Sequence, residues 1–120
     1  MATILVIDDE EPIRSLLRAV LEGDSHQVLE ASNGRHGLEL YRERSADLII
    51  TDLVMPEMNG LEMIMELTRA FRDVKVIAMS GGGKSEAALS LAKLLGARQT
   101  LHKPIDMDEL LSAVRYNLAH

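Results

Sequence analysis

The chain has 120 residues, enough for a substantial core, and we expect a single domain over residues 1–120. Hydrophobic residues make up 47% of the chain and aromatic residues 2%, which predicts an aliphatic core and argues against base stacking. The net charge of −6 argues against direct nucleic-acid binding, and the absence of cysteine excludes disulfides, thiolate catalysis and cysteine metal sites. With no secretory signal pattern and no apolar run of membrane-spanning length, we expect a cytoplasmic protein that binds no membrane.

Five short apolar runs, each ended by polar or turn-forming residues, predict five β-strands. The first and third runs are almost continuously apolar, which is typical of strands buried on both faces of a parallel sheet. The second run is weaker and depends on Val28 and Leu29, as expected of a strand at the sheet edge. The predicted strands cover residues 3–7, 26–31, 48–51, 74–79 and 98–101.

Apolar residues at helical spacing predict a helix after each strand. Pro12 and Gly23 mark the start and end of the first helix, the second covers residues 35–43, and the third begins at about Gly60. Gly96 ends the fourth, and Asp106 or Asp108 caps the last. We expect these residues to face inward: Ile13, Leu16, Leu17, Val20, Leu21, Leu38, Tyr41, Leu61, Ile64, Met65, Thr68, Phe71, Ala87, Ala88, Leu91, Leu94, Leu95, Leu110, Leu111, Val114 and Leu118.

Strict alternation of strands and helices predicts an α/β fold, a doubly wound five-stranded parallel sheet with helices on both faces. Because crossover connections are right-handed, we expect the strand order 2-1-3-4-5. Ligands bind such sheets beyond the carboxyl ends of the strands, where polar residues of this chain would meet. These residues are Asp8, Asp9, Asp52, Ser80 and Lys103.

The three acids predict a cation site, because like charges repel by on the order of 4 kcal/mol per pair at about 4 Å and an effective dielectric constant of about 20. Mg²⁺ takes oxygen ligands and is typically held by one or two carboxylates together with phosphate. With Mg²⁺ and Lys103 neutralising a phosphoryl group, Asp52 is the candidate nucleophile that attacks phosphorus. Ser80 could then hydrogen-bond a phosphoryl oxygen.

Taken singly, each residue has a simpler explanation. Asp8-Asp9-Glu10 fits a solvated turn or the acidic start of a helix, and Asp52 fits a cap. Ser80 alone fits a turn, and Lys103 alone fits an exposed side chain. Their shared position after predicted parallel strands favours a functional site.

These residues resemble the motifs of the receiver (CheY-like) domain of bacterial two-component response regulators, and the resemblance extends over essentially the whole chain. The matching motifs are Asp8-Asp9, the run from Asp52 through Met55-Pro56 and Met58 to Gly60, Ser80-Gly81, and Lys103-Pro104. The resemblance implies a flavodoxin-like fold and a phosphorylatable signalling switch.

By this resemblance, Asp52 accepts a phosphoryl group from a sensor histidine kinase or a histidine phosphotransfer protein, and the modified chain changes its binding to a downstream effector. Ser80 would be the switch hydroxyl, and Lys103 would bind phosphate. The resemblance implies no enzyme activity beyond self-phosphorylation and slow dephosphorylation. We expect an unphosphorylated monomer.

The resemblance also implies the Mg²⁺ ligands. Asp9, Asp52 and the main-chain carbonyl of Val54 would hold the ion, with Asp8 acting through metal-bound water. No other cofactor is expected.

Two positions depart from the family pattern. Thr100 stands where many receivers have a Tyr or Phe whose rotamer follows the switch hydroxyl, and Ile105 replaces a frequent Phe. We expect output to depend on backbone shifts and smaller side chains, and we expect a cis Lys103-Pro104 bond. Since no output segment follows Leu118 in the sequence, a stand-alone receiver is favoured over a fragment.

Two other functions share this architecture. A Mg²⁺-dependent phosphatase with an aspartyl-phosphate intermediate usually has a second acid two residues after its nucleophile, where this chain has Val54. A flavin carrier needs a hydroxyl-rich phosphate loop after the first strand, where this chain has acids. Residues 82–85, Gly-Gly-Lys-Ser, lack the leading glycine of a nucleotide-binding loop. His26, His36, His102 and His120 are expected at the surface.

Overall fold

The computed structural model describes residues 1–55, 58–81 and 85–120. Pro56, Gly82, Gly83 and Lys84, which belong to the motifs considered above, lie outside the described residues. Strands and helices alternate along the chain. They are β1 (Thr3–Ile7), α1 (Glu11–Gly23), β2 (Gln27–Ala31), α2 (Gly34–Glu43), β3 (Leu48–Asp52), α3 (Gly60–Ala70), β4 (Val76–Ser80), α4 (Ser85–Leu95), β5 (Gln99–His102) and α5 (Met107–Ala119).

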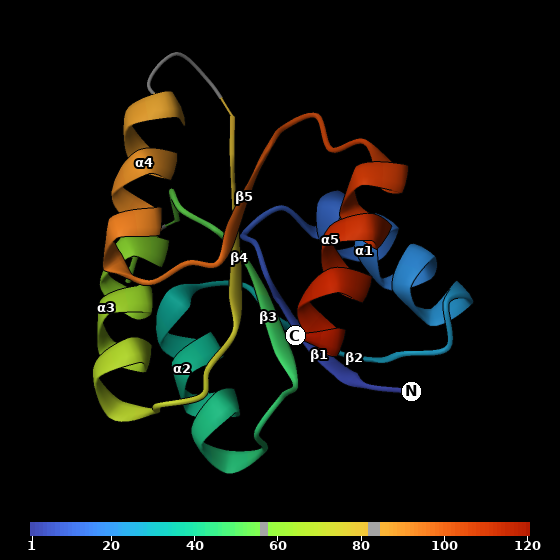
Figure 1. Ribbon diagram of the computed structural model, residues 1–120, viewed down its shortest axis with the longest axis horizontal. Coiled ribbons are helices and arrows are strands. Elements are labelled where there is room, and N and C mark those ends of the chain that lie inside the picture. Colours follow the sequence, from blue (N-terminus) through green and yellow to red (C-terminus); the bar gives the residue numbers. More distant parts are fainter. Residues whose placement is uncertain (56–57, 82–84) are drawn as a thin grey trace.

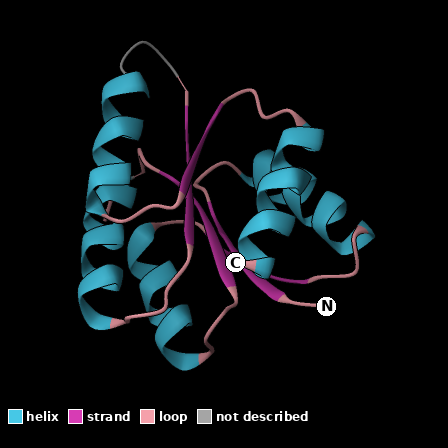
Figure 2. Ribbon diagram, viewed as in Figure 1, coloured by secondary structure: helices cyan, strands magenta, loops and turns pink. Residues whose placement is uncertain are grey.

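The sheet has the order β2-β1-β3-β4-β5, and each neighbouring pair of strands is parallel. Helices α1 and α5 cover one face, and α2, α3 and α4 cover the other (Figure 1). Figure 2 shows the sheet nearly edge-on between these two helical layers. The predicted fold class and strand order are confirmed.

The core has two parts, one on each face of the sheet, because successive residues of a strand point in opposite directions. In β1, Ile4 and Val6 pack in the cluster shared with α1 and α5, whereas Leu5 and Ile7 pack in the cluster shared with α2, α3 and α4. All four side chains are fully buried. Burial of one such side chain stabilises the fold by about 1.5–3 kcal/mol, so the central strands form a rigid base for the residues at their ends.

Several helix residues that were predicted to face inward are exposed in the structure. In α4 the buried positions are Leu89 and Ala92, while Leu91 and Leu94 are 45% and 84% exposed. The helix carries apolar residues on several sides, so spacing alone does not identify the row that packs against α3 and the sheet. The residues predicted inward and found exposed are Leu16, Met65, Ala87, Leu91 and Leu94.

Side-chain caps fix the starts of α2, α3 and α5 near the carboxyl edge of the sheet, and that of α2 is Asn33. Asp106 accepts hydrogen bonds from the main-chain N–H groups of Asp108 (2.8 Å) and Glu109 (3.1 Å), so Asp106 rather than Asp108 caps α5. Asn59 accepts from the N–H of Glu62 (3.0 Å) at the start of α3.

None of the helices in the described part of the chain combines the length and the apolar character that a membrane span requires.

Candidate functional site

Four strands bring the predicted site residues to one edge of the sheet. Asp8 follows β1, Asp52 ends β3, Ser80 ends β4 and Lys103 follows β5. The register places Ser80 beside His102, and the N–H of Lys103 donates to the main-chain oxygen of Ser80 over 2.8 Å. The hydrogen bonds of the parallel sheet therefore fix the main-chain positions from which these side chains extend.

The Lys103 amine lies among the acids. Its Nζ is 2.8 Å from Asp8 Oδ2, 3.3 Å from Asp52 Oδ2 and 3.4 Å from Glu10 Oε1. The Lys103 side chain is 15% exposed, and the Asp8 side chain is fully buried. Buried ion pairs are favourable only with good geometry and further hydrogen bonds, so this arrangement depends on the neighbouring main chain.

Main-chain groups hold the two buried carboxylates in place. Asp52 Oδ1 accepts a hydrogen bond from the N–H of Leu53 (2.8 Å), and Asp8 Oδ1 accepts one from the N–H of Glu10 (2.9 Å). Gly60, at the start of α3, packs directly against Asp52, because a Cβ atom there would overlap the main-chain oxygen of Asp52. The glycine is thus needed for the close approach of α3 to this edge.

Burial and charge have opposing effects on the titration of Asp52 and Lys103. Burial raises the pKa of Asp52 above its ordinary value and nearby Asp8 adds to this, although Lys103 partly offsets the rise. Burial alone would lower the pKa of Lys103, but hydrogen bonds and charge from Asp8 and Asp52 outweigh it and raise the pKa. Lys103 is therefore cationic at neutral pH, and its charge favours the ionised form of Asp52.

The acids offer a set of oxygen ligands for a hard cation. One carboxylate oxygen from each of Asp8, Asp9, Glu10 and Asp52 lies within 4.8 Å of the others. Lys103 supplies a single positive charge against these four carboxylates, and oxygen donors are the ligands that Mg²⁺ prefers. The residues therefore fit Mg²⁺. Glu10 was not predicted in this group, although its place in the acidic run was a signal for it.

A cavity of about 280 Å³ opens beside the acids. Val54 is 70% exposed, and Ser80 is buried at the end of β4. The cavity is therefore bordered by acidic, hydroxyl and ammonium groups together. Its lining residues are Asp9, Glu10, Asp52, Val54, Ser80, Gly81 and Lys103.

The structure also locates the two departures from the family pattern. Thr100 lies in the edge strand β5, where it is half-buried, and Ile105 packs partly buried against the cluster beneath α1 and α5. The predicted cis bond between Lys103 and Pro104 is present.

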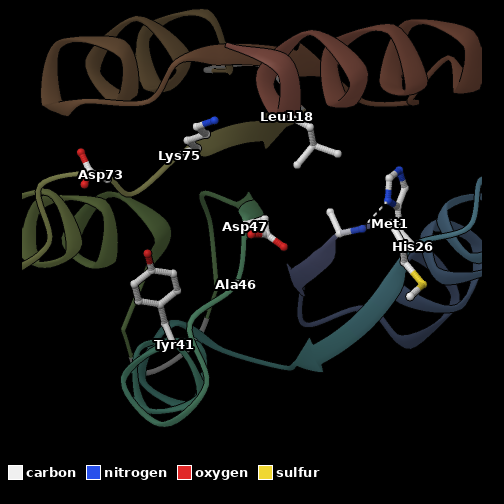
Figure 3. Close-up of a pocket in the computed structure, with 9 residues that line it drawn as sticks. Met1, His26, Tyr41, Ala46, Asp47, Asp73, Lys75 and Leu118 are labelled. Carbon is white, nitrogen blue, oxygen red and sulfur yellow. Dashed lines mark hydrogen bonds between the residues drawn. The ribbon is translucent and has the colours of Figure 1, made fainter.

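A larger cavity of about 550 Å³ lies at the opposite, amino edge of the sheet (Figure 3). Its polar groups are mostly bound to the main chain: Asp47 accepts from the N–H of Thr3 (2.8 Å), and Lys75 donates to the oxygen of Asn117 (2.8 Å). His26 accepts from the N–H of Ala2, and its side chain is only 10% exposed, contrary to the predicted surface position. These contacts provide hydrogen-bond partners for main-chain groups at the start of β1 and near the end of α5.

Comparison with known proteins agrees with this geometry. The chain matches the response regulator receiver domain over residues 4–115. It is 35% identical to protein PilH of Pseudomonas aeruginosa, covering 99% of both chains, and 32% identical to sporulation initiation phosphotransferase F of Bacillus subtilis, covering 93% of this chain and 90% of that one. A crystal structure of a response regulator receiver domain protein from Clostridium thermocellum superposes with a TM-score of 0.92 at 34% identity, covering 99% of this chain and 95% of that chain.

The chain therefore belongs to the receiver domain family of two-component response regulators, whose members are signalling switches. This membership favours a switch over the phosphatase and flavin-carrier alternatives.

Proposed function

We propose that Asp52 accepts a phosphoryl group from a phosphohistidine of a sensor histidine kinase or a histidine phosphotransfer protein. The observation that carries this proposal is the contact of the Lys103 amine with both Asp52 and Asp8 beside an oxygen-lined cavity. A lysine amine in this position contacts the carboxylates in the unmodified protein and can bind the phosphoryl oxygens once the group is attached to Asp52.

Mg²⁺ fits the acids beside Asp52. Asp9, Asp52 and the main-chain carbonyl of Val54 would hold the ion, with Asp8 and Glu10 near enough to act directly or through water. When bound, Mg²⁺ supplies positive charge that neutralises the oxygens of the phosphoryl group.

The transfer forms one bond and breaks another. A carboxylate oxygen of Asp52 attacks phosphorus, and the bond between phosphorus and the donor nitrogen breaks, with its electron pair remaining on the donor imidazole. Lys103 and Ser80 would bind the equatorial oxygens and orient the phosphorus toward Asp52. The product is an aspartyl phosphate.

Phosphorylation would change which groups Lys103 contacts. A phosphoryl group brings a charge of about −1.5 to −2 and three strong hydrogen-bond acceptors, which compete with Asp8 and Asp52 for the amine. Ser80 and Gly81 lie next to this position and would move with it. We propose that these shifts alter binding to a downstream effector protein in the cytoplasm, and that the unphosphorylated chain is a monomer.

Slow hydrolysis fits this role. Val54 stands two residues after Asp52, where an aspartyl-phosphate phosphatase usually places its general acid, and Val54 has no proton to transfer. The chain would therefore catalyse its own phosphorylation and slow dephosphorylation without turning over other substrates.

Acetyl phosphate tests the proposal directly. Wild-type protein incubated with acetyl phosphate and Mg²⁺ is expected to gain the mass of one phosphoryl group, and chelation of Mg²⁺ is expected to prevent the gain. The isosteric variant Asp52→Asn should gain none, while Asp47→Asn, just before the start of the same strand, should react like wild type. A phosphoryl adduct that forms equally on Asp52→Asn would refute the assignment.

A further inference from the structure

A partly buried arginine reaches the acidic turn from the side of α1. Arg14 lies in α1, and its side chain is 15% exposed. Its Nη1 donates to the main-chain oxygen of Asp8 over 2.7 Å, and its Nε donates to Glu30 Oε1 over 3.0 Å. The guanidinium therefore links α1, the edge strand β2 and the residue that follows β1.

This contact completes the hydrogen bonding of the Asp8 main chain. The N–H of Asp8 donates to the oxygen of Ala31 (3.1 Å), which continues the ladder between β1 and β2. β2 ends at Ala31, so the carbonyl of Asp8 lies beyond the ladder, where a buried acceptor needs a side-chain partner. Arg14 provides this partner.

The Asp8 carboxylate is oriented by the main chain that Arg14 holds. The N–H of Asp8, bound to β2, fixes the peptide plane between Ile7 and Asp8, and the carbonyl of Asp8, bound to Arg14, fixes the plane between Asp8 and Asp9. Asp8 then directs Oδ1 to the N–H of Glu10 and Oδ2 to Lys103. A tilt of the plane between Asp8 and Asp9, which Arg14 holds, would move Asp8, Asp9 and Glu10 together.

We infer that Arg14 is a positioning residue, which holds the Asp8-Asp9-Glu10 turn in the geometry that binds the divalent cation. This inference rests on the proposed function. Arg14 does not line the cavity beside the acids, and it acts through the carbonyl of Asp8. Residues that orient metal ligands from behind typically change metal affinity by about 10- to 100-fold when removed.

Arg18 provides a matched control. It lies one turn further along α1 and pairs with the same Glu30, with Nε 2.7 Å from Oε2. Its Nη2 donates to the oxygen of Val28, a residue within β2, rather than to Asp8. Removal of Arg18 therefore weakens the same attachment of α1 to β2 but leaves the carbonyl of Asp8 bound.

The experiment compares Mg²⁺ affinity by isothermal titration calorimetry in wild type, Arg14→Ala, Arg14→Lys and Arg18→Ala. We expect about 10-fold weaker binding for Arg14→Ala and at most about a twofold change for Arg18→Ala. Arg14→Lys is expected to lose most of the affinity too, because one ammonium cannot reproduce the fork that joins Asp8 to Glu30. Equal affinities in Arg14→Ala and Arg18→Ala would overturn the inference.

Two further readouts separate positioning from stability and from the proposed function. Phosphorylation of Arg14→Ala by acetyl phosphate should need about 10-fold more Mg²⁺ for its half-maximal rate and recover at saturating Mg²⁺. If Arg14→Ala does not fold, Arg14→Lys decides the question, and wild-type Mg²⁺ affinity in that variant overturns the inference. If wild type itself binds no Mg²⁺ and gains no phosphoryl group, the proposed function fails, whatever the variants do.

Discussion

Both edges of the sheet carry acidic side chains beside a lysine, but they use these groups differently. At the amino edge, Lys75 and Asp47 bind main-chain groups of Asn117 and Thr3, so each charge completes the hydrogen bonding of a strand end or helix end. At the carboxyl edge, Lys103 binds Asp8 and Asp52, and the acids face one another.

This difference shows which group of charges is available for chemistry. The carboxylates at the carboxyl edge crowd together at a cost that a cation would offset, whereas Asp47 and Lys75 at the amino edge already have neutral partners. The number of acids at an edge is therefore a poorer guide to function than the identity of their partners. Variants matched between the two edges test this comparison.

The largest effect is expected from removal of Lys103. Lys103→Ala should lower the rate of phosphorylation by acetyl phosphate roughly 100-fold or more, because it removes a fixed charge from the transition state. Lys75→Ala, at the amino edge, should keep the wild-type rate. The measurement is the initial rate of phosphoryl incorporation at saturating Mg²⁺.

Mg²⁺ affinity shows whether the roles at the carboxyl edge are divided correctly. Lys103→Ala should still bind Mg²⁺, since the carboxylates remain. If this variant loses Mg²⁺ binding while Lys75→Ala keeps it, the assignment of Lys103 to phosphate rather than to the metal site is wrong.

A smaller effect is expected from the glycine that packs on Asp52. Gly60→Ala should lower the free energy of unfolding by about 2 kcal/mol, because the added methyl group overlaps main-chain atoms of β3 and forces α3 away. Gly23→Ala, at the end of α1, meets no atom within 4 Å and should leave the stability unchanged or slightly higher. Urea unfolding of the two variants measures the difference, and equal midpoints would contradict the packing argument.

The smallest effect concerns the ionisation of Asp52. Since burial disfavours its charged form, Asp52→Asn should raise the stability of the Mg²⁺-free protein at neutral pH by about 1 kcal/mol. Asp47→Asn should bring no gain, because its carboxylate serves the N–H of Thr3. Thermal unfolding in a chelator tests both variants.

The advantage of Asp52→Asn should depend on pH. In the unfolded chain Asp52 titrates near 3.8, and in the folded chain its pKa is higher, so between these values the folded state binds more protons. The wild type therefore loses stability from this group as pH rises from about 3.8 through the folded pKa. The gap between the two proteins should widen over that window and stay constant above it. A gap that narrows as pH rises would show that Asp52 is stabilised as an anion.

The sequence predicted the sheet well because β1 and β3 are buried on both faces, which requires continuous apolar runs with polar residues at their ends. The positions of Asp8, Asp52, Ser80 and Lys103 at one edge then followed from the strand order. Glu10 was missed because a third acid after a strand is equally typical of an exposed turn, and the turn geometry decides which way it points.

The wrong predictions in α4 and the unpredicted contact of Arg14 have a common cause. The exposed positions of Leu91 and Leu94 could not be predicted, because a helix with apolar residues on several sides can pack along more than one row. The contact of Arg14 with Asp8 depends on a main-chain carbonyl, and the sequence pattern carries no signal for such a partner. Both features depend on how the elements pack together.

The most direct test of Asp52 as the phosphorylated residue is the location of the acyl phosphate. Protein phosphorylated by acetyl phosphate with Mg²⁺ is reduced with borohydride, which converts an aspartyl phosphate to homoserine, and peptides are then sequenced by mass spectrometry. We expect homoserine at position 52 and none at Asp8, Asp9 or Asp47. Homoserine at any of these other acids, with Asp52 unmodified, would contradict this assignment.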